Sequence, residues 1–196
     1  MNIYLHELTK YEPQIEFMKE GIKMNRVKLV LPNIKYKESI MDYKNEFIRN
    51  GDSMDGTAGL ANAQSFEEWY QAFKDNLKEE TVREGLVPAT TYLAIDETNK
   101  LVGMIDIRHK LNEYLLNYGG HIGYSVRKSE RRKGYATEML KLALEKCKEL
   151  NIKRVLITCD KNNIASACTI LKNGGEFENE IIDEHEVTQR YWINLI

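Results

Sequence analysis

The sequence has little cysteine and proline and no long apolar run. Three of its 196 residues are prolines and three are cysteines, at positions 147, 159 and 168. The cysteines form no CxxC pair, so we expect free thiols in a reducing compartment, the cytoplasm, and no zinc or other metal site. No segment approaches the roughly 20 apolar residues of a membrane-spanning helix, and residues 1–11 show no secretory signal, so we expect no membrane partner.

An excess of charge of one sign is missing as well. The 28 Lys and Arg residues nearly balance the 30 Asp and Glu residues, and the net charge is −2. Nucleic-acid-binding domains are usually basic, so this balance argues against a nucleic-acid partner. Apolar residues make up 42% of the chain and charged residues 30%, which is ordinary for a globular protein and too apolar for a disordered one.

The pattern divides the chain into an N-terminal extension, residues 1–26, and a single domain, residues 27–196. The extension is polar, is interrupted by Pro13 and Gly21, and has a pattern that specifies no structure. The first part of the domain predicts a strand at Val27–Leu31, a helix at 36–49, a loop at 51–63, and a helix that starts at Ser65, where Glu68 gives the spacing of a capping box.

The second part of the domain alternates strands and helices. Asn151 stands where a left-handed C-terminal cap would follow the longest helix. The first two strands of this part should form an antiparallel hairpin, and residues 120–160 a right-handed parallel crossover. This order predicts an α/β (α+β) domain with a mixed sheet. The expected elements are strands at 89–95, 101–107, 120–126, 154–159, 177–182 and 188–196, a turn or short helix at 112–117, and helices at 134–150 and 163–172.

A short basic segment lies between the strand at 120–126 and the long helix. Residues 127–133 contain five basic residues and one acidic residue, a local net charge of +4, and Gly134 follows where the helix begins. Unpaired N–H groups, the helix dipole and a glycine together suit a phosphate or pyrophosphate. The segment is neither a P-loop nor a GxGxxG motif. A solvated basic turn before an amphipathic helix is the alternative.

The spacing around this glycine resembles a known signature. Arg131-x-x-Gly134-x-Ala136 follows the strand end Gly123-Tyr124-Ser125-Val126, and it resembles the Gln/Arg-x-x-Gly-x-Gly/Ala signature of the GNAT superfamily of N-acetyltransferases. A second element, Asn163-x-x-Ser166, opens the next helix, and Glu176 loosens the Gly-Phe pair that often follows in that family. The resemblance covers roughly residues 88–182, reaches the helices before them, and leaves the residues before Val27 outside.

The resemblance implies a GNAT-type mixed, splayed β-sheet that binds acetyl-CoA. Two parallel strands, here 120–126 and 154–159, would diverge and admit the pantetheine arm. Asn163 and Ser166 would contact the arm or the pyrophosphate from the far side, although a plain helix cap is the alternative for Asn163. The backbone at Ser125 and Val126 would pair with pantetheine, and the pyrophosphate would lie on Arg131, Arg132, Lys133, Gly134, Tyr135, Ala136 and Thr137.

Catalytic residues are less well marked. Many GNAT enzymes protonate the leaving thiolate with a tyrosine seven positions after the asparagine, where this chain has Ile170, which cannot donate. The family's general base is often a Glu or His on the strand before the motif, and His121 occupies such a position. An ordinary histidine titrates near pH 6.5, which suits a base, but a structural histidine is the alternative. Arg108 and His109 could line the acceptor pocket, or form a solvated strand end.

These observations predict an N-acetyltransferase that moves an acetyl group from acetyl-CoA to a primary amine of a small molecule or a protein, by direct attack. Flexible, acidic residues at 51–57 could favour a cationic amine, and a mobile surface loop without a binding role is the alternative. The missing tyrosine keeps open a non-catalytic acyl-CoA-binding module. A nucleic-acid binder is the third reading, and it is disfavoured because no aromatic residues interleave the short basic cluster. Edge strands near the C-terminus are compatible with a homodimer.

Overall fold

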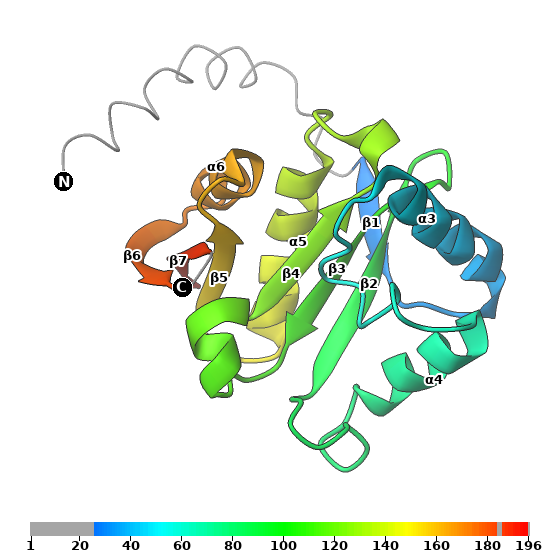
Figure 1. The fold of residues 1–196 in the computed structure, drawn as a ribbon, viewed down its shortest axis with the longest axis horizontal. Helices are drawn as coiled ribbons and strands as arrows, with labels where there is room; N and C mark the ends of the chain where they lie inside the picture. Colours follow the sequence, from blue (N-terminus) through cyan, green and yellow to red (C-terminus); the bar gives the residue numbers. More distant parts are fainter. Residues whose placement is uncertain (1–25, 184–185, 196) are drawn as a thin grey trace.

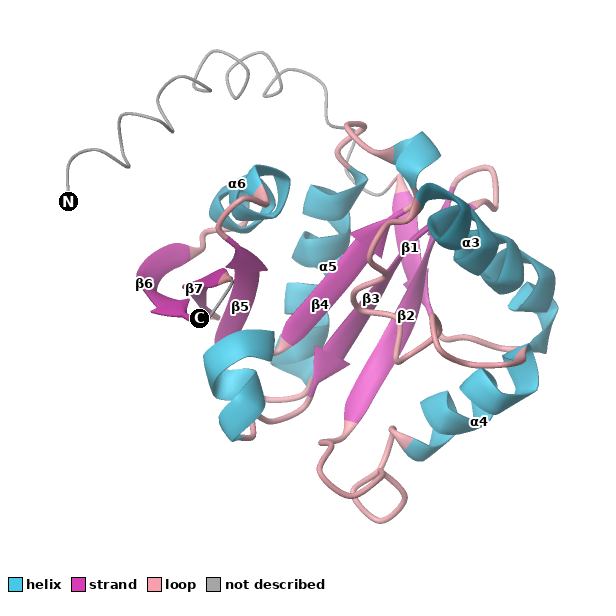
Figure 2. Cartoon of the chain, viewed as in Figure 1, coloured by secondary structure: helices cyan, strands magenta, loops and turns pink. Residues whose placement is uncertain are grey.

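The computed structural model describes residues 26–183 and 186–195 (Figure 1). The predicted N-terminal extension lies outside the described residues, apart from Arg26. The seven strands of the described part form two antiparallel sheets, and helices pack around them (Figure 2).

The larger sheet has the strand order β1-β2-β3-β4. Its members are β1 (Val27–Val30), β2 (Ala89–Asp96), β3 (Leu101–Arg108) and β4 (Ile122–Val126). The predicted hairpin of β2 and β3 is confirmed, with Leu93 opposite Met104. Asn99 takes the left-handed conformation in its turn, and the Asp96 carboxylate accepts the Thr98 N–H at 2.9 Å, an arrangement typical of Asp and Asn in turns.

Helices cover both faces of this sheet. On one face lie α3 (Lys37–Asn50) and α4 (Phe66–Asp75), whose aromatic residues enclose Leu93 and Met104. The predicted start of α4 is confirmed, because the Ser65 hydroxyl accepts the Glu68 N–H at 3.2 Å. On the other face lies α5 (Tyr135–Glu149), and Met139 packs directly against the backbone of Gly103. The left-handed cap at Asn151 is confirmed by its φ of 59°.

The smaller sheet has the order β5-β7-β6. It contains β5 (Arg154–Asp160), β6 (Glu176–Ile182) and β7 (Val187–Asn194), and α6 (Ile164–Lys172) lies between β5 and β6 in the chain. Buried residues of β5, β7, α5 and α6 share one core with the α5 face of the larger sheet. No helix in the described part is both long enough and apolar enough to cross a membrane.

The end of the larger sheet is hydrogen-bonded to β5 of the smaller sheet at His121. The His121 N–H donates to the Leu156 carbonyl at 2.7 Å, and the Leu156 N–H donates to His121 Nδ1 at 2.9 Å. Beyond this point β4 and β5 run in the same direction without forming a ladder within the described residues (Figure 1). The predicted crossover and splay are therefore present, but the sheet expected to be mixed is two antiparallel sheets whose neighbouring strands diverge.

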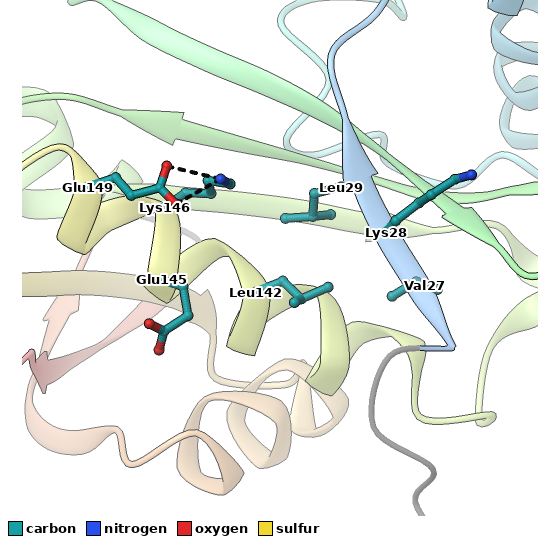
Figure 3. A pocket seen from close by; sticks show the side chains of 7 residues that line it. All are labelled: Val27, Lys28, Leu29, Leu142, Glu145, Lys146 and Glu149. Carbon is teal, nitrogen blue, oxygen red and sulfur yellow. Dashed lines mark hydrogen bonds and ion pairs between the residues drawn. The ribbon is translucent and has the colours of Figure 1, made fainter.

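A shallow groove of about 380 Å³ runs between β1 and α5 (Figure 3). It follows the middle and C-terminal half of α5, away from the basic segment. The Lys146 ammonium on its rim is paired with Glu149 at 2.8 Å. None of the residues predicted to bind a ligand lines it: the lining residues are Val27, Lys28, Leu29, Leu142, Glu145, Lys146 and Glu149.

Candidate functional site

The segment between β4 and α5 is shaped to present backbone N–H groups. A short 3-10 turn, η3 (Lys128–Glu130), follows Arg127, and then Arg132 and Gly134 both take left-handed conformations with φ of 62° and 84°. Left-handed residues within a turn can bring successive N–H groups to one concave side, a form that binds anions. The first turn of α5 adds N–H groups that have no partner within the helix. This geometry suits a pyrophosphate.

The basic side chains of this segment are mostly tied to carboxylates. The Arg127 guanidinium is buried and pairs with Asp42 at 2.9 Å and Glu46 at 3.1 Å, both on α3. Lys133 pairs with Glu130 at 2.8 Å. Much of the local excess of positive charge in the sequence is thus neutralised by carboxylates.

Arg131 holds the segment in place. Its Nε donates to the Val126 carbonyl at 3.0 Å, and its Nη2 pairs with Asp52 at 3.0 Å. The Ser129 N–H donates to Glu46 at 3.1 Å. The basic segment is therefore fastened to α3 and to the residues that follow it. A phosphate contact by the Arg131 side chain would require it to leave these partners.

The edge of β4 that faces β5 is open. The Arg127 N–H donates to the Val102 carbonyl at 3.0 Å, and Ser125 lies opposite Met104. Backbone groups alternate along a strand, so the N–H and C=O of Ser125 point to β3, whereas those of Tyr124 and Val126 point toward β5. Of the two predicted backbone contacts, Val126 is on the open edge and Ser125 is turned away from it.

The start of α6 reaches this edge across the gap. The Asn163 side chain accepts the Ser166 N–H at 3.1 Å, so Asn163 is a helix cap, as the alternative reading held. The Ser166 hydroxyl lies 2.8 Å from the Tyr124 hydroxyl. Burial raises the pKa of Tyr124 to about 12, so this phenol stays protonated at neutral pH. The predicted contacts of Asn163 and Ser166 with a cofactor stay predictions.

His121 lies at the joint of the two sheets and is 7% exposed. Because its Nδ1 accepts the Leu156 N–H, the proton of the neutral ring is on Nε2 and no basic nitrogen is free. Burial and the charge of Arg108 lower its pKa from 6.5 to about 4. These contacts suit the structural alternative, and the catalytic role of His121 stays a prediction that they do not support.

Arg108 lies on the face of the larger sheet that α3 covers. Its guanidinium pairs with Asp106 at 3.4 Å and donates to the Gly119 carbonyl at 2.9 Å. It also lies against Gly123, where an added Cβ would be 3.2 Å from the guanidinium. His109 is further out, with Nε2 2.8 Å from the Thr90 hydroxyl. Thr90 lies opposite Ile107, which packs in the core on the α5 side, so His109 is on the opposite face from Arg108. The structure therefore does not bring the two residues together on one face, and their role in an acceptor pocket stays a prediction.

The residues between α3 and α4 pack directly on β4. An added Cβ at Gly56 would come within 2.1 Å of the Gly123 carbonyl oxygen, so only a glycine allows this approach. The Ser125 hydroxyl donates to the Asp55 carbonyl at 2.6 Å, and Tyr43 of α3 donates to the Ser125 carbonyl at 2.9 Å. The predicted flexible loop is thus anchored at its middle, beside the open edge of β4.

Several residues of this site carry no signal in the sequence. Tyr124 is part of the motif, but its contact with α6 depends on the divergence of two strands. Asp52 and Glu46 belong to α3 and its end, far along the chain from the segment they hold. The sequence pattern places Arg26 in the extension, yet it contacts the start of α5. Only the glycine-rich composition of residues 51–63 hinted at a close approach of backbones.

The comparisons with known proteins agree with this geometry. The family model described as the acetyltransferase (GNAT) domain matches residues 36–176, which is more than half of the chain. No curated protein sequence matches this chain.

Several solved acetyltransferase structures have the same fold. RimL, a ribosomal L7/L12 α-N-protein acetyltransferase solved with coenzyme A, aligns with a TM-score of 0.65 and 14% identity, over 87% of this chain and 95% of its own. The spermidine N-acetyltransferase of Vibrio cholerae, solved with CoA and spermine, aligns with a TM-score of 0.61 and 13% identity, over 86% of this chain and 95% of its own. The microcin C7 self-immunity acetyltransferase MccE, solved with acetyl-CoA and AMP, aligns with a TM-score of 0.59 and 20% identity, over 89% of this chain and 96% of its own.

Proposed function

Because this chain belongs to the GNAT acetyltransferase family, we propose that it is an acyltransferase that moves an acetyl group from acetyl-CoA to a primary amine. One observation carries the proposal: the concave backbone of Arg132 and Gly134 at the start of α5 lies next to the open edge of β4. A pyrophosphate on that backbone would direct an attached arm into the gap between β4 and β5.

The arm of acetyl-CoA fits the open edge. Pantetheine carries amide groups, and no neighbouring strand of the described part uses the N–H and C=O of Tyr124 or the N–H of Val126. The Val126 carbonyl accepts Arg131 Nε at 3.0 Å. Pairing along this edge would carry the thioester toward the joint at His121 and Leu156. The residues that pack on Gly123 and Ser125 then lie on the side from which an amine would approach.

The reaction forms a C–N bond as the amine attacks the thioester carbonyl, and it breaks the C–S bond. Its rate would come mainly from positioning and from exclusion of water. The amine must arrive neutral or lose its proton on the way, and His121 has no free nitrogen for that task. Tyr124 can donate a hydrogen bond to the departing sulfur from the α6 side, a part that Ile170 cannot take. Tyr124→Phe is then expected to lower kcat about tenfold without weakening cofactor binding, as measured by steady-state kinetics and calorimetry.

The acceptor is an amine of a small molecule or a protein, the two classes that the related structures represent. RimL acts on a ribosomal protein and the Vibrio cholerae enzyme on spermidine. The acidic residues at 51–57 favour a cationic amine less than their number indicates, because Asp52 is paired with Arg131 at 3.0 Å. A panel that contains polyamines and peptide N-termini is therefore the suitable screen.

Two glycine variants test the cofactor site. Gly134 and Gly85 have nearly equal φ values, 84° and 83°, so a valine strains both backbones alike, but Gly85 lies in open space away from α5. We expect Gly134→Val to weaken acetyl-CoA binding at least tenfold in calorimetry and Gly85→Val to leave it unchanged. Equal binding by both variants would overturn the pyrophosphate assignment.

The wild-type protein separates the enzyme from the alternative module. Release of free thiol in the presence of one amine of the panel supports the transferase. Binding of acetyl-CoA without turnover on any amine would favour the non-catalytic acyl-CoA-binding module, and absence of binding would overturn both.

A further inference from the structure

Arg26 lies outside the motif but contacts the start of α5. Its Nη2 donates to the Lys133 carbonyl at 2.8 Å, and its guanidinium lies 5.1 Å from the centre of the Tyr135 ring. A Cβ added to Gly134 would come within 3.2 Å of the same Nη2. We propose that Arg26 is a positioning residue that orients the Lys133–Gly134 peptide for cofactor binding, an inference that rests on the proposed function.

The planarity of the peptide bond supplies the mechanism. In a trans peptide the C=O of Lys133 and the N–H of Gly134 point in opposite directions. No peptide bond in the described part is cis. When Arg26 holds the Lys133 carbonyl on one side, the Gly134 N–H is directed to the other side, where the anion would lie. Arg26 therefore acts through the backbone and does not itself touch the phosphate.

This constraint matters because the peptide next to a glycine turns easily. Gly134 has a φ of 84°, a region that glycine occupies freely along with several others. Without a partner for the Lys133 carbonyl, rotation of this peptide would turn the Gly134 N–H away from the anion. A charged donor on the carbonyl is a stronger restraint than a neutral one.

A buried carboxylate keeps Arg26 in place. Glu138 of α5 is 7% exposed, and its Oε1 accepts the Val27 N–H at 3.0 Å. Its Oε2 lies 3.4 Å from Arg26 Nε. The first residue of β1 and the residue before it are thus fixed to the first turn of α5. The sequence gives no sign of this contact, because more than 100 residues separate the partners.

Kinetics with two thioesters test the proposal. Acetyl-CoA contains the pyrophosphate, whereas S-acetyl-N-acetylcysteamine has the reacting thioester without it. We expect Arg26→Ala to raise the KM for acetyl-CoA about tenfold with kcat within twofold of wild type, and to leave kcat/KM for the truncated thioester unchanged. Arg26→Lys, which keeps a charged donor, should recover much of the loss. Arg83→Ala, an exposed arginine far from α5, is the matched control.

Each other outcome counts against the proposal. An unchanged KM for acetyl-CoA in a folded Arg26→Ala protein overturns it, and an equal loss with both thioesters shows a general structural role instead. If Arg26→Ala fails to fold, Arg26→Gln is measured in the same way and judged by the same criteria. If the wild type does not bind acetyl-CoA, the proposed function itself is overturned. If the wild type binds and the Arg26 variant binds equally well, only the role of Arg26 is overturned.

Discussion

The imidazole of His121 is kept neutral by its surroundings. Burial and Arg108 lower its pKa from 6.5 to about 4, and its Nδ1 accepts the Leu156 N–H that joins the two sheets. As the pH falls, the imidazole of the unfolded chain is protonated near pH 6.5, whereas that of the folded protein is protonated only near pH 4. The folded state therefore loses stability between about pH 6.5 and 4. A pKa shift of this size corresponds to a loss of at most roughly 3 kcal/mol in the free energy of unfolding.

His121→Asn isolates this effect. An asparagine side chain offers an acceptor in place of Nδ1 and does not titrate. We expect the variant to flatten the fall in stability between pH 6.5 and 4, measured by urea unfolding at a series of pH values. Retention of kcat would show that His121 is structural. A fall of 100-fold or more, with acetyl-CoA binding intact, would restore it as the general base.

At the scale of elements, α3 holds the basic segment, residues 127–133, largely through the buried Arg127. The Arg127 side chain is 7% exposed, and its two carboxylate partners differ in environment, with Glu46 15% exposed and Asp42 61% exposed. Glu46 also accepts the Ser129 N–H at 3.1 Å. Removal of a buried partner leaves a desolvated charge, whereas an exposed partner contributes little.

The two carboxylates provide a matched comparison. We expect Glu46→Ala to lower the free energy of unfolding by about 2 kcal/mol, and Asp42→Ala by less than about 1 kcal/mol, in chemical denaturation. Only Glu46→Ala should also weaken acetyl-CoA binding, because it frees the 3-10 turn before the concave backbone. Equal losses of stability in the two variants would contradict the role assigned to burial.

The elements were predictable where their signals are local. Ser65 with Glu68, Asn151 and Gly134 fix helix ends through their own backbone and near neighbours, and the structure has these ends where the pattern places them. The charge of the basic segment is misleading for the opposite reason. Arg127 is neutralised by residues about 80 positions away, and such pairing depends on how α3 packs on the sheet, which a pattern of single residues does not contain.

At the scale of the whole molecule, the candidate site joins parts that are otherwise separate. Its floor is the larger sheet, its far wall is α6, and the start of α5 lies at one end (Figure 1). The hydrogen bond between His121 and Leu156 joins the two sheets. The sequence predicted this frame through the family resemblance, but not the acceptor side, where residues 51–63 have no motif. The predicted homodimer stays a prediction. Its expected contact is an edge strand near the C-terminus, and β6 is the edge strand there, with Phe177 and Ile182 exposed.

A ligand that binds across these parts should stabilise the whole fold. Binding to the native state alone at 100 times Kd contributes about 2.7 kcal/mol. For a domain of this size each kcal/mol raises Tm by roughly 2–4 °C, so we expect acetyl-CoA to raise it by about 5–10 °C in differential scanning fluorimetry. Acetyl-pantetheine, which lacks the pyrophosphate, should give a much smaller rise at the same concentration, as should acetyl-CoA with Gly134→Val. Equal shifts with both ligands would mean that the start of α5 contributes nothing to binding, and would move the cofactor's anchor elsewhere on the molecule.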